Sequence, residues 1–227
     1  MMQNIFVTAI GTEIGKTYVS AATLLAARKR SLSVHALKPL MSGFSPDEYL
    51  HSDAGILLTA AGEDINEPAL AKTCLHALPP ALAPNVAARQ IGVEIDDEAL
   101  IEFCRVGLET KADFHLIEGA GGVLSPATDT LLQVDLIATL NLPVILVAAN
   151  YLGAVSHTLT ALESLERRNI NVSAIVVSQP TRETAHPDGL IAELARLHAE
   201  IPVFAAPFEA PATALGEAVL STLERRQ

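Results

Sequence analysis

The sequence predicts a single α/β domain over residues 1–227, built on a doubly wound and mainly parallel sheet. Short, nearly continuous apolar runs alternate with helical patterns along the chain, and such runs are typical of parallel strands that helices cover on both faces. Hydrophobic residues make up 50% of the chain and aromatic residues only 4%, which favours an aliphatic core of helices packed on a buried sheet. No linker, internal repeat or low-complexity segment divides the 227 residues.

Six segments are strand candidates, and each is rich in aliphatic or β-branched residues. They are residues 4–9, 34–40, 114–122, 143–150, 172–179 and 201–207. Segment 114–122 is expected to be a strand that opens into a glycine turn. Helices between successive strands imply right-handed crossovers, which place the strands in one parallel sheet.

Helical patterns fill most of the chain between these runs. They cover residues 16–30, 52–62, 97–110, 155–165, 186–199 and 210–225, and Asp96 is a candidate N-cap for the third of them. The stretch 76–90 contains the three prolines Pro79, Pro80 and Pro84, and we expect it to be a loop. Long ordered loops in compact domains are often functional, although a plain surface connection is the alternative.

Charge and cysteine content narrow the class of protein. The chain carries 15 basic and 26 acidic residues and has no basic stripe, so we expect no nucleic-acid partner. Cys74 and Cys104 are far apart and lack a CxxC spacing, which favours unpaired thiols over a disulfide. The N-terminus lacks a signal-peptide pattern and no apolar run approaches a membrane span, so we expect a cytoplasmic protein without a membrane partner.

A phosphate-binding loop is predicted at residues 9–17. Gly15, Lys16 and Thr17 follow the first strand and open the first helix, where backbone N–H groups and the lysine can hold phosphate and the threonine hydroxyl can reach Mg²⁺. The strict pattern G-x-x-x-x-G-K-[ST] would need a glycine where Ile10 stands. The strand–loop–helix context nevertheless predicts a P-loop NTPase-like fold rather than a purely structural turn.

Three further charged residues are expected near this loop. Glu118 ends a strand and could hold a metal ion, or it is a solvated loop residue. Asp53 begins a short helix, where it could bind metal or serve only as a cap. Lys38 also ends a strand and could stabilise charge on a transferring phosphoryl group, although a lone lysine there is more often exposed to solvent.

Six segments, in order along most of the chain, make the sequence resemble the dethiobiotin synthetase family. They are "FVTAIGTEIGKT" (6–17), "KPLMSG" (38–43), "SDA" (52–54), "APNVAAR" (83–89), "IEGAGG" (117–122) and "PVILVAANYLGAVSH" (143–157). The family's loop is one residue longer than the strict phosphate-loop pattern, and its first glycine falls where Ala9 stands.

The resemblance implies a set of site residues. Lys38, Lys16 and Thr12 would be catalytic, and Thr17, Asp53 and Glu118 would hold Mg²⁺. Substrate would be bound by Thr12, Ser42, Lys38, Gly153 and Ser156. ATP would be bound by Glu13, Ile14, Gly15, Lys16, Thr17, Tyr18, Asp53, Glu118, Gly119, Gly121, Ser178 and Gln179.

The family's reaction would use ATP, CO₂ or bicarbonate, and the diamino acid 7,8-diaminopelargonate. An amine of the substrate captures CO₂ as a carbamate, the carbamate attacks the γ-phosphate, and the second amine closes the ureido ring with release of phosphate. The family is homodimeric, and the helix after residue 152 contributes to substrate binding across the interface.

The chain also departs from the family's usual residues. Ala9, Ile10 and Gly11 change the entry to the loop, and Asn85 replaces a histidine. Tyr151 replaces a basic residue and Ser156 an asparagine, both near the position of the substrate's carboxylate tail. Ser178 replaces the asparagine that contacts adenine. The triphosphate and metal residues, in contrast, match the family.

Two alternatives therefore remain open. One is an ATP-dependent carboxylase or ligase that acts on a related diamine or amino acid, and the other is a non-catalytic nucleotide-binding regulator. A partition-type ATPase is disfavoured because its signature lysine would fall at Gly11.

Overall fold

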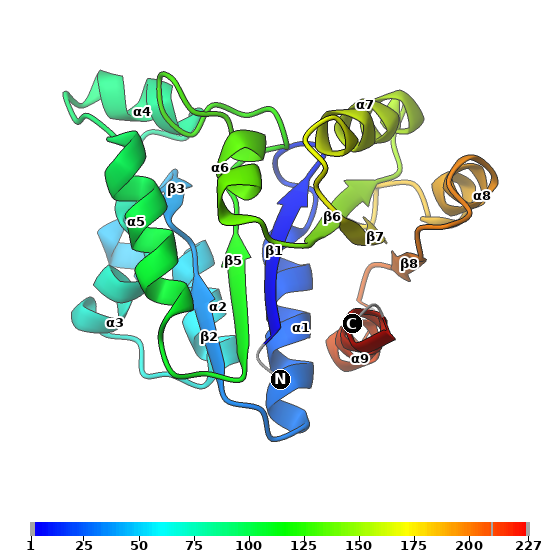
Figure 1. Cartoon of the computed structure of the whole chain (residues 1–227), viewed down its shortest axis with the longest axis horizontal. Helices are drawn as coiled ribbons and strands as arrows, with labels where there is room; N and C mark the ends of the chain where they lie inside the picture. Colours follow the sequence, from blue (N-terminus) through cyan, green and yellow to red (C-terminus); the bar gives the residue numbers. More distant parts are fainter. Residues whose placement is uncertain (1–2, 210, 226–227) are drawn as a thin grey trace.

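The computed structural model describes residues 3–209 and 211–225, and it contains a six-stranded parallel sheet with the order β2-β5-β1-β6-β7-β8 (Figure 1). The strands are β1 (Gln3–Ala9), β2 (Val34–Leu37), β5 (Phe114–Glu118), β6 (Val144–Ala149), β7 (Val172–Ser178) and β8 (Val203–Ala206). Every neighbouring pair in this sheet is parallel. The predicted α/β class with a doubly wound parallel sheet is confirmed.

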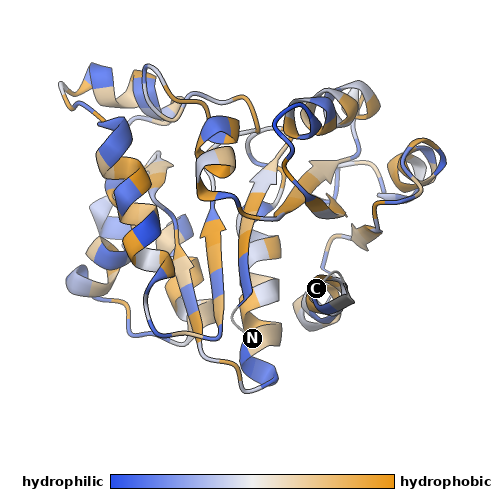
Figure 2. Ribbon diagram, in the orientation of Figure 1, coloured by the Kyte–Doolittle hydropathy of each residue, from blue (hydrophilic) through white to orange (hydrophobic). Residues whose placement is uncertain are grey.

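Helices cover both faces of the sheet and bury one apolar core on each. The first core joins the sheet to α1 (Lys16–Lys29), α2 (Asp53–Ala61) and α9 (Ala212–Arg225). The second joins it to α5 (Asp97–Leu108), α6 (Gln133–Leu140), α7 (Ala154–Glu166) and α8 (Asp188–Leu197). All residues of β6 and β7 are buried, which explains why β6 is apolar throughout and β7 is apolar except for Ser173 and Ser178, and Figure 2 shows these strands as mainly hydrophobic.

The helix predictions are confirmed to within a few residues at each end, and two caps explain where helices begin. Asp96 accepts a hydrogen bond from the Ala99 N–H at 2.7 Å, as predicted for the start of α5. At the start of α2 the cap is Ser52, whose hydroxyl accepts from the Gly55 N–H at 3.1 Å. The predicted start of the last helix, residue 210, lies outside the described residues.

The predicted strand over 34–40 is wrong in its extent, because the chain leaves the main sheet at Pro39. Proline has no N–H to donate to a strand ladder, so β2 ends at Leu37. The chain resumes as β3 (Leu40–Ser42), which pairs with β4 (His76–Leu78) in a separate two-stranded parallel sheet. This break places Lys38 between the two sheets.

The predicted loop over 76–90 is also wrong. It contains β4 and the short helix α4 (Pro84–Gln90). Pro84 occupies the first turn of α4, where a missing N–H costs nothing, so this proline begins a helix instead of preventing one. Three elements had no prediction at all: η1 (Pro46–His51), α3 (Glu67–Thr73) and α6.

The two cysteines and the lengths of the helices also bear on predictions from the sequence. Cys74 and Cys104 are both unpaired, as predicted, and both are buried. Within residues 3–209 and 211–225, no helix is long and apolar enough to cross a membrane.

Candidate active site

A pocket of about 560 Å³ opens at the carboxyl ends of β1, β2 and β5. Ligands of open parallel sheets bind at this edge, where loops from neighbouring strands diverge. The pocket is lined by Thr12, Glu13, Gly15, Lys16, Thr17, Lys38, Met41, Ser42, Asp53, Ala81, Leu82, Ala83, Pro84, Ala120, Gly121 and Ser125.

The loop between β1 and α1 forms one wall of the pocket. Gly15 has φ +91° and Glu13 has φ +56°, so these two residues make the left-handed turns of the loop. The N-terminus of α1 receives no side-chain cap from the residues that the structure describes, which leaves its first N–H groups available to an anion.

The altered entry to this loop needs no glycine at Ala9. Ala9 is the last residue of β1 and pairs with Val147 of β6 in ordinary strand geometry. The close approach occurs at Gly122 instead, where an added Cβ would lie 3.1 Å from the Gly11 nitrogen and 3.2 Å from the Ala9 oxygen. A side chain at Gly122 would therefore push the loop away from β5.

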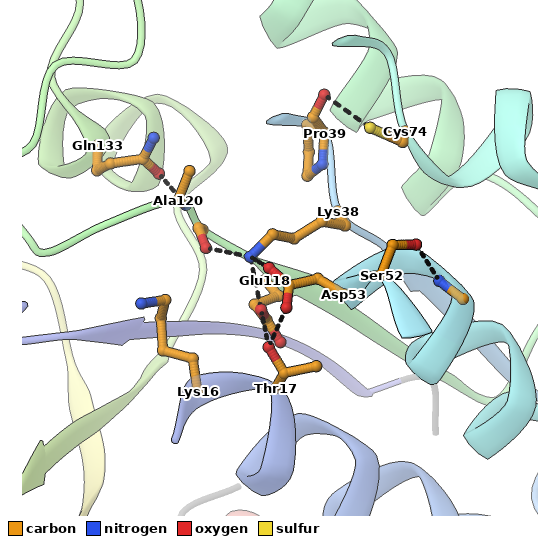
Figure 3. Close-up of polar contacts among 12 residues, drawn as sticks. Lys16, Thr17, Lys38, Pro39, Ser52, Asp53, Cys74, Glu118, Ala120 and Gln133 are labelled. Carbon is orange, nitrogen blue, oxygen red and sulfur yellow. Dashed lines mark hydrogen bonds and ion pairs between the residues drawn. The ribbon is translucent and has the colours of Figure 1, made fainter. Parts of the chain in front are cut away.

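Lys38, Asp53 and Glu118 form a charge network at the floor of the pocket, where Lys38 and Asp53 line the cavity and Glu118 is buried beneath its lining (Figure 3). The Lys38 ammonium lies 2.6 Å from Glu118 Oε1 and 2.8 Å from Asp53 Oδ2, and it also donates to the Gly119 carbonyl at 3.0 Å. Lys38 is 2% exposed and Glu118 is fully buried. Lys38 is thus not the solvent-facing lysine that the sequence left possible.

Thr17 connects the phosphate loop to the same network. Its hydroxyl lies 2.8 Å from Asp53 Oδ1 and 2.9 Å from Glu118 Oε1. Because Ser52 caps α2, the Asp53 carboxylate is available to Thr17 and Lys38. The capping interpretation of Asp53 is therefore wrong.

The two lysines of the pocket have opposite electrostatic surroundings. Burial, together with the positive charge of Lys38, lowers the pKa of Lys16 to about 8. Burial alone would lower the pKa of Lys38 as well, but the carboxylates of Glu118 and Asp53 outweigh it and raise that pKa above its usual value. Burial would raise the pKa of Asp53, yet the charge of Lys38 and the hydrogen bonds from Lys38 and Thr17 lower it. An anionic phosphate near Lys16 would stabilise its charged form.

The donor set at this floor fits Mg²⁺. One hydroxyl and two carboxylates converge, and these are the hard oxygen ligands that Mg²⁺ prefers. Glu118 Oε2 is buried and has no hydrogen-bond partner among the described residues, so a ligand oxygen remains for a cation. No three His, Cys, Asp or Glu side chains are grouped as a metal site in the described chain, so phosphate oxygens and water would complete the coordination.

The remaining predicted site residues fall into two groups. Thr12, Glu13, Gly15, Ser42 and Gly121 line the pocket with the residues already described. A second group is absent from the described lining: Ile14, Tyr18, Glu118, Gly119, Gly153, Ser156, Ser178 and Gln179. Within it, Ile14 of the loop and Ser178 at the end of β7 are buried, and Gly153 and Ser156 lie at the start of α7.

Sequence reasoning missed several residues of the pocket. Ser125 accepts a hydrogen bond from the Gly122 N–H at 2.8 Å and so shapes the glycine turn after β5. Residues 81–84 form a second wall, and its sequence signals are the segment "APNVAAR" and the proline-containing stretch 76–90. Outside the lining, Gln133 of α6 accepts a hydrogen bond from the N–H of the lining residue Ala120 at 3.4 Å, a contact that no local pattern indicates.

The fold and the pocket define a P-loop-type nucleotide-binding α/β protein. The AAA domain family model matches residues 3–209, and a chain titled ATP-dependent dethiobiotin synthetase BioD from Phenylobacterium zucineum is 44% identical, with 96% of this chain and 95% of the relative covered. A second relative of the same title, from Caulobacter vibrioides, is 46% identical over 78% of this chain and 80% of its own length. The chain belongs to the family of ATP-dependent dethiobiotin synthetases.

Solved structures agree with the fold. A ParA family ATPase from Chlorobium tepidum is 13% identical with a TM-score of 0.55 and covers 100% of this chain and 93% of its own. The cell division ATPase MinD of Pyrococcus furiosus is 15% identical with a TM-score of 0.53 and full coverage of both chains. At these identities the likeness concerns the fold alone.

Proposed function

We propose that this protein carries out the ATP- and Mg²⁺-dependent carboxylation and ring closure of 7,8-diaminopelargonate to dethiobiotin, with release of ADP and phosphate. One observation carries the proposal: two lysines and an oxygen ligand set meet in a single pocket that Thr12 and Ser42 also line. The names of the relatives at 44% and 46% identity support the same activity.

The chemistry needs charge neutralisation and positioning rather than a protein nucleophile. CO₂ and one substrate amine form a carbamate and lose a proton. A carbamate oxygen then attacks the γ-phosphorus, the bond to the β–γ bridging oxygen breaks, and ADP leaves. The second amine attacks the carbonyl carbon of the resulting mixed anhydride and loses a proton, the bond from that carbon to the phosphate oxygen breaks, phosphate leaves, and the cyclic urea forms.

Each residue of the pocket would contribute to one part of this sequence. Lys16 and Lys38 would neutralise negative charge on the transferring phosphoryl group and the carbamate. The ion pairs with Glu118 and Asp53 hold the Lys38 ammonium in a fixed position, so little reorganisation would be needed during the reaction. Thr12 and Ser42 would hydrogen-bond the reacting end of the diamine.

Thr17, Asp53 and Glu118 would hold Mg²⁺, which supplies charge stabilisation to the phosphate oxygens when it is bound. The N–H groups at the start of α1, from Gly15 onward, would hold the phosphates. In this mechanism the substrates supply both the nucleophile and the leaving group.

We also propose a homodimer in which segment 151–157 meets a second copy of the chain. Leu152 has a relative exposure of 102% and Tyr151 of 38%, immediately before α7. Exposed apolar side chains of this kind fit a surface that another chain covers. The substrate tail would then be bound by residues from both copies, including Gly153 and Ser156.

A direct assay tests the proposed activity. Purified protein would be incubated with Mg-ATP and bicarbonate, with and without 7,8-diaminopelargonate, while phosphate release and the ring product are followed. We expect phosphate release that requires the diamine and matches the product in amount. ATP hydrolysis that ignores the diamine, or no turnover with it, would contradict the proposal.

A further inference from the structure

Ser178, at the end of β7, has its hydroxyl directed at the phosphate loop. The hydroxyl donates a hydrogen bond to the backbone carbonyl of Ile14, and the Ala148 carbonyl lies 3.3 Å away. Ser178 is 2% exposed. A hydroxyl has a single proton to donate, and here a backbone carbonyl of the loop receives it.

The same side chain also packs directly against Gly15. A Cβ added to Gly15 would lie 3.0 Å from Ser178 Oγ and 3.2 Å from Ser178 Cβ. Ser178 therefore supports the loop from the sheet side, at the residue with φ +91° that leads into α1.

Anchoring the Ile14 carbonyl orients the next N–H group. The chain contains no cis peptide bond in its described part, and a trans peptide directs its C=O and N–H to opposite sides. With the Ile14 oxygen held toward β7, the N–H of Gly15 is directed away from the sheet, toward the pocket that Gly15 lines. That N–H is one of the groups expected to bind phosphate.

Gln179, the neighbouring residue expected to bind ATP, is likewise engaged within the protein. Its Nε2 donates to the Thr184 carbonyl at 2.8 Å, and its Oε1 accepts from the Phe208 N–H at 3.2 Å. Both polar side chains at the end of β7 thus hold backbone groups of this chain.

We propose that Ser178 is a positioning residue for the phosphate loop, and that it acts on the nucleotide's phosphates through Ile14 and Gly15 instead of recognising the base. This inference rests on the proposed function only in that the pocket binds a nucleoside triphosphate. It predicts that loss of the hydroxyl weakens every triphosphate ligand equally, whether or not the ligand carries a base.

Inorganic tripolyphosphate has no base, so its binding distinguishes positioning of the phosphate loop from recognition of the base. Dissociation constants for Mg-tripolyphosphate and Mg-ATP would be measured by titration calorimetry on the wild-type protein, Ser178→Ala and Ser173→Ala. Ser173 is the matched control, since it is also a buried serine of β7, 2% exposed, but lies at the opposite end of the strand. We expect Ser178→Ala to raise both dissociation constants about 10-fold and by the same factor, and Ser173→Ala to change neither more than about twofold.

Binding stoichiometry and circular dichroism separate loop positioning from loss of folded protein. A merely structural role would lower the stoichiometry and leave the dissociation constant of the remaining protein unchanged, which would overturn the proposal. If Ser178→Ala does not fold, the nearly isosteric Ser178→Cys, a weaker donor, carries the test and is expected to show a smaller but still equal rise for both ligands.

Two further results would overturn the inference. One is weaker ATP binding with unchanged tripolyphosphate binding, which would assign base recognition to Ser178. The other is a wild-type protein that binds neither ligand. The measurement needs no diamine, so a failure to form dethiobiotin would contradict the proposed function without altering this result.

Discussion

The phosphate end of the candidate site and the segment 151–157 before and within α7 are held in different ways. The phosphate end comprises Lys16, Thr17, Lys38, Asp53 and Glu118. The last four are joined by hydrogen bonds and ion pairs of 2.6–2.9 Å, and the Lys16 ammonium donates to the Gly11 carbonyl of the loop at 3.1 Å. Segment 151–157 lies mostly on the surface, with Ala154 buried in the core, and a hydrogen bond of 2.8 Å joins Tyr151 Oη and His157 Nδ1.

This difference follows from the cost of burying charge. A buried ammonium or carboxylate must have a partner, so the geometry of the phosphate end is determined by this chain alone. Exposed side chains can rely on water and carry no such constraint. We therefore propose that the chemistry of the site is set within one chain, whereas recognition of the substrate's tail depends on what a second copy brings to segment 151–157.

Removal of Lys38 is expected to give the largest effect. Lys38→Ala deletes the ammonium between Glu118 and Asp53, and we expect the rate of dethiobiotin formation to fall about 100- to 1,000-fold. Product formation is measured at saturating substrates, with circular dichroism to verify folding. Lys72→Ala, at an exposed lysine of α3, is the control and should retain full activity. A Lys38→Ala enzyme within about threefold of wild type would show that the network is structural only.

Glu118→Gln should weaken the use of Mg²⁺. The amide keeps the shape of the side chain but loses its charge, so we expect the Mg²⁺ concentration for half-maximal activity to rise about 10- to 100-fold. A Mg²⁺ titration of the initial rate measures this. Glu163→Gln removes an exposed carboxylate from α7, paired with Arg167, and should leave the titration unchanged. An equal shift in both variants would argue against a metal at Glu118.

Binding of Mg-ATP at the phosphate end should stabilise the folded protein. Mg-ATP at about 100 times its dissociation constant is expected to raise the free energy of unfolding by about 2.7 kcal/mol. Chemical denaturation with and without the ligand measures the difference. Chelation of Mg²⁺ with EDTA should remove most of the gain, and a gain that survives EDTA would mean that the metal site contributes little to nucleotide binding.

The smallest effect is expected at segment 151–157. If Tyr151 and Ser156 no longer recognise the carboxylate, a diamine analogue without that carboxylate should have a KM close to that of 7,8-diaminopelargonate. Tyr151→Lys restores a basic residue and should lower the KM for the natural diamine about fivefold, since an exposed ion pair contributes about 1 kcal/mol.

The analogue is the matched control for this variant, because its KM should not respond to the added lysine. A wild-type enzyme that strongly prefers the natural diamine would instead show that the tail is recognised elsewhere, and the contrast between the two ends would then be weaker than proposed.

Local sequence patterns are sufficient to predict part of the fold and of the candidate site. Gly15, Lys16 and Thr17 were predicted from a strand–loop–helix context within one short segment, and the Asp96 cap from its place before a helical pattern. The predictions are wrong for elements whose sequence is compatible with more than one structure. The prolines in 76–90 indicate a loop because proline has no backbone N–H to donate. The first turn of a helix does not need that N–H either, so Pro84 is equally compatible with the start of α4.

The sequence by itself determined the fold class, the position of the phosphate loop and the set of charged residues that surround it. These features are readable because the spacing of apolar residues and the placement of turn residues determine the local structure of a few neighbouring residues. Only the tertiary structure decided what these residues do. Lys38 is ion-paired rather than exposed because β5 brings Glu118 next to it, and Asp53 turns to Thr17 because Ser52 caps its helix. Ser178 supports Ile14 for the same reason: β7 ends beside a loop that lies far away in the sequence.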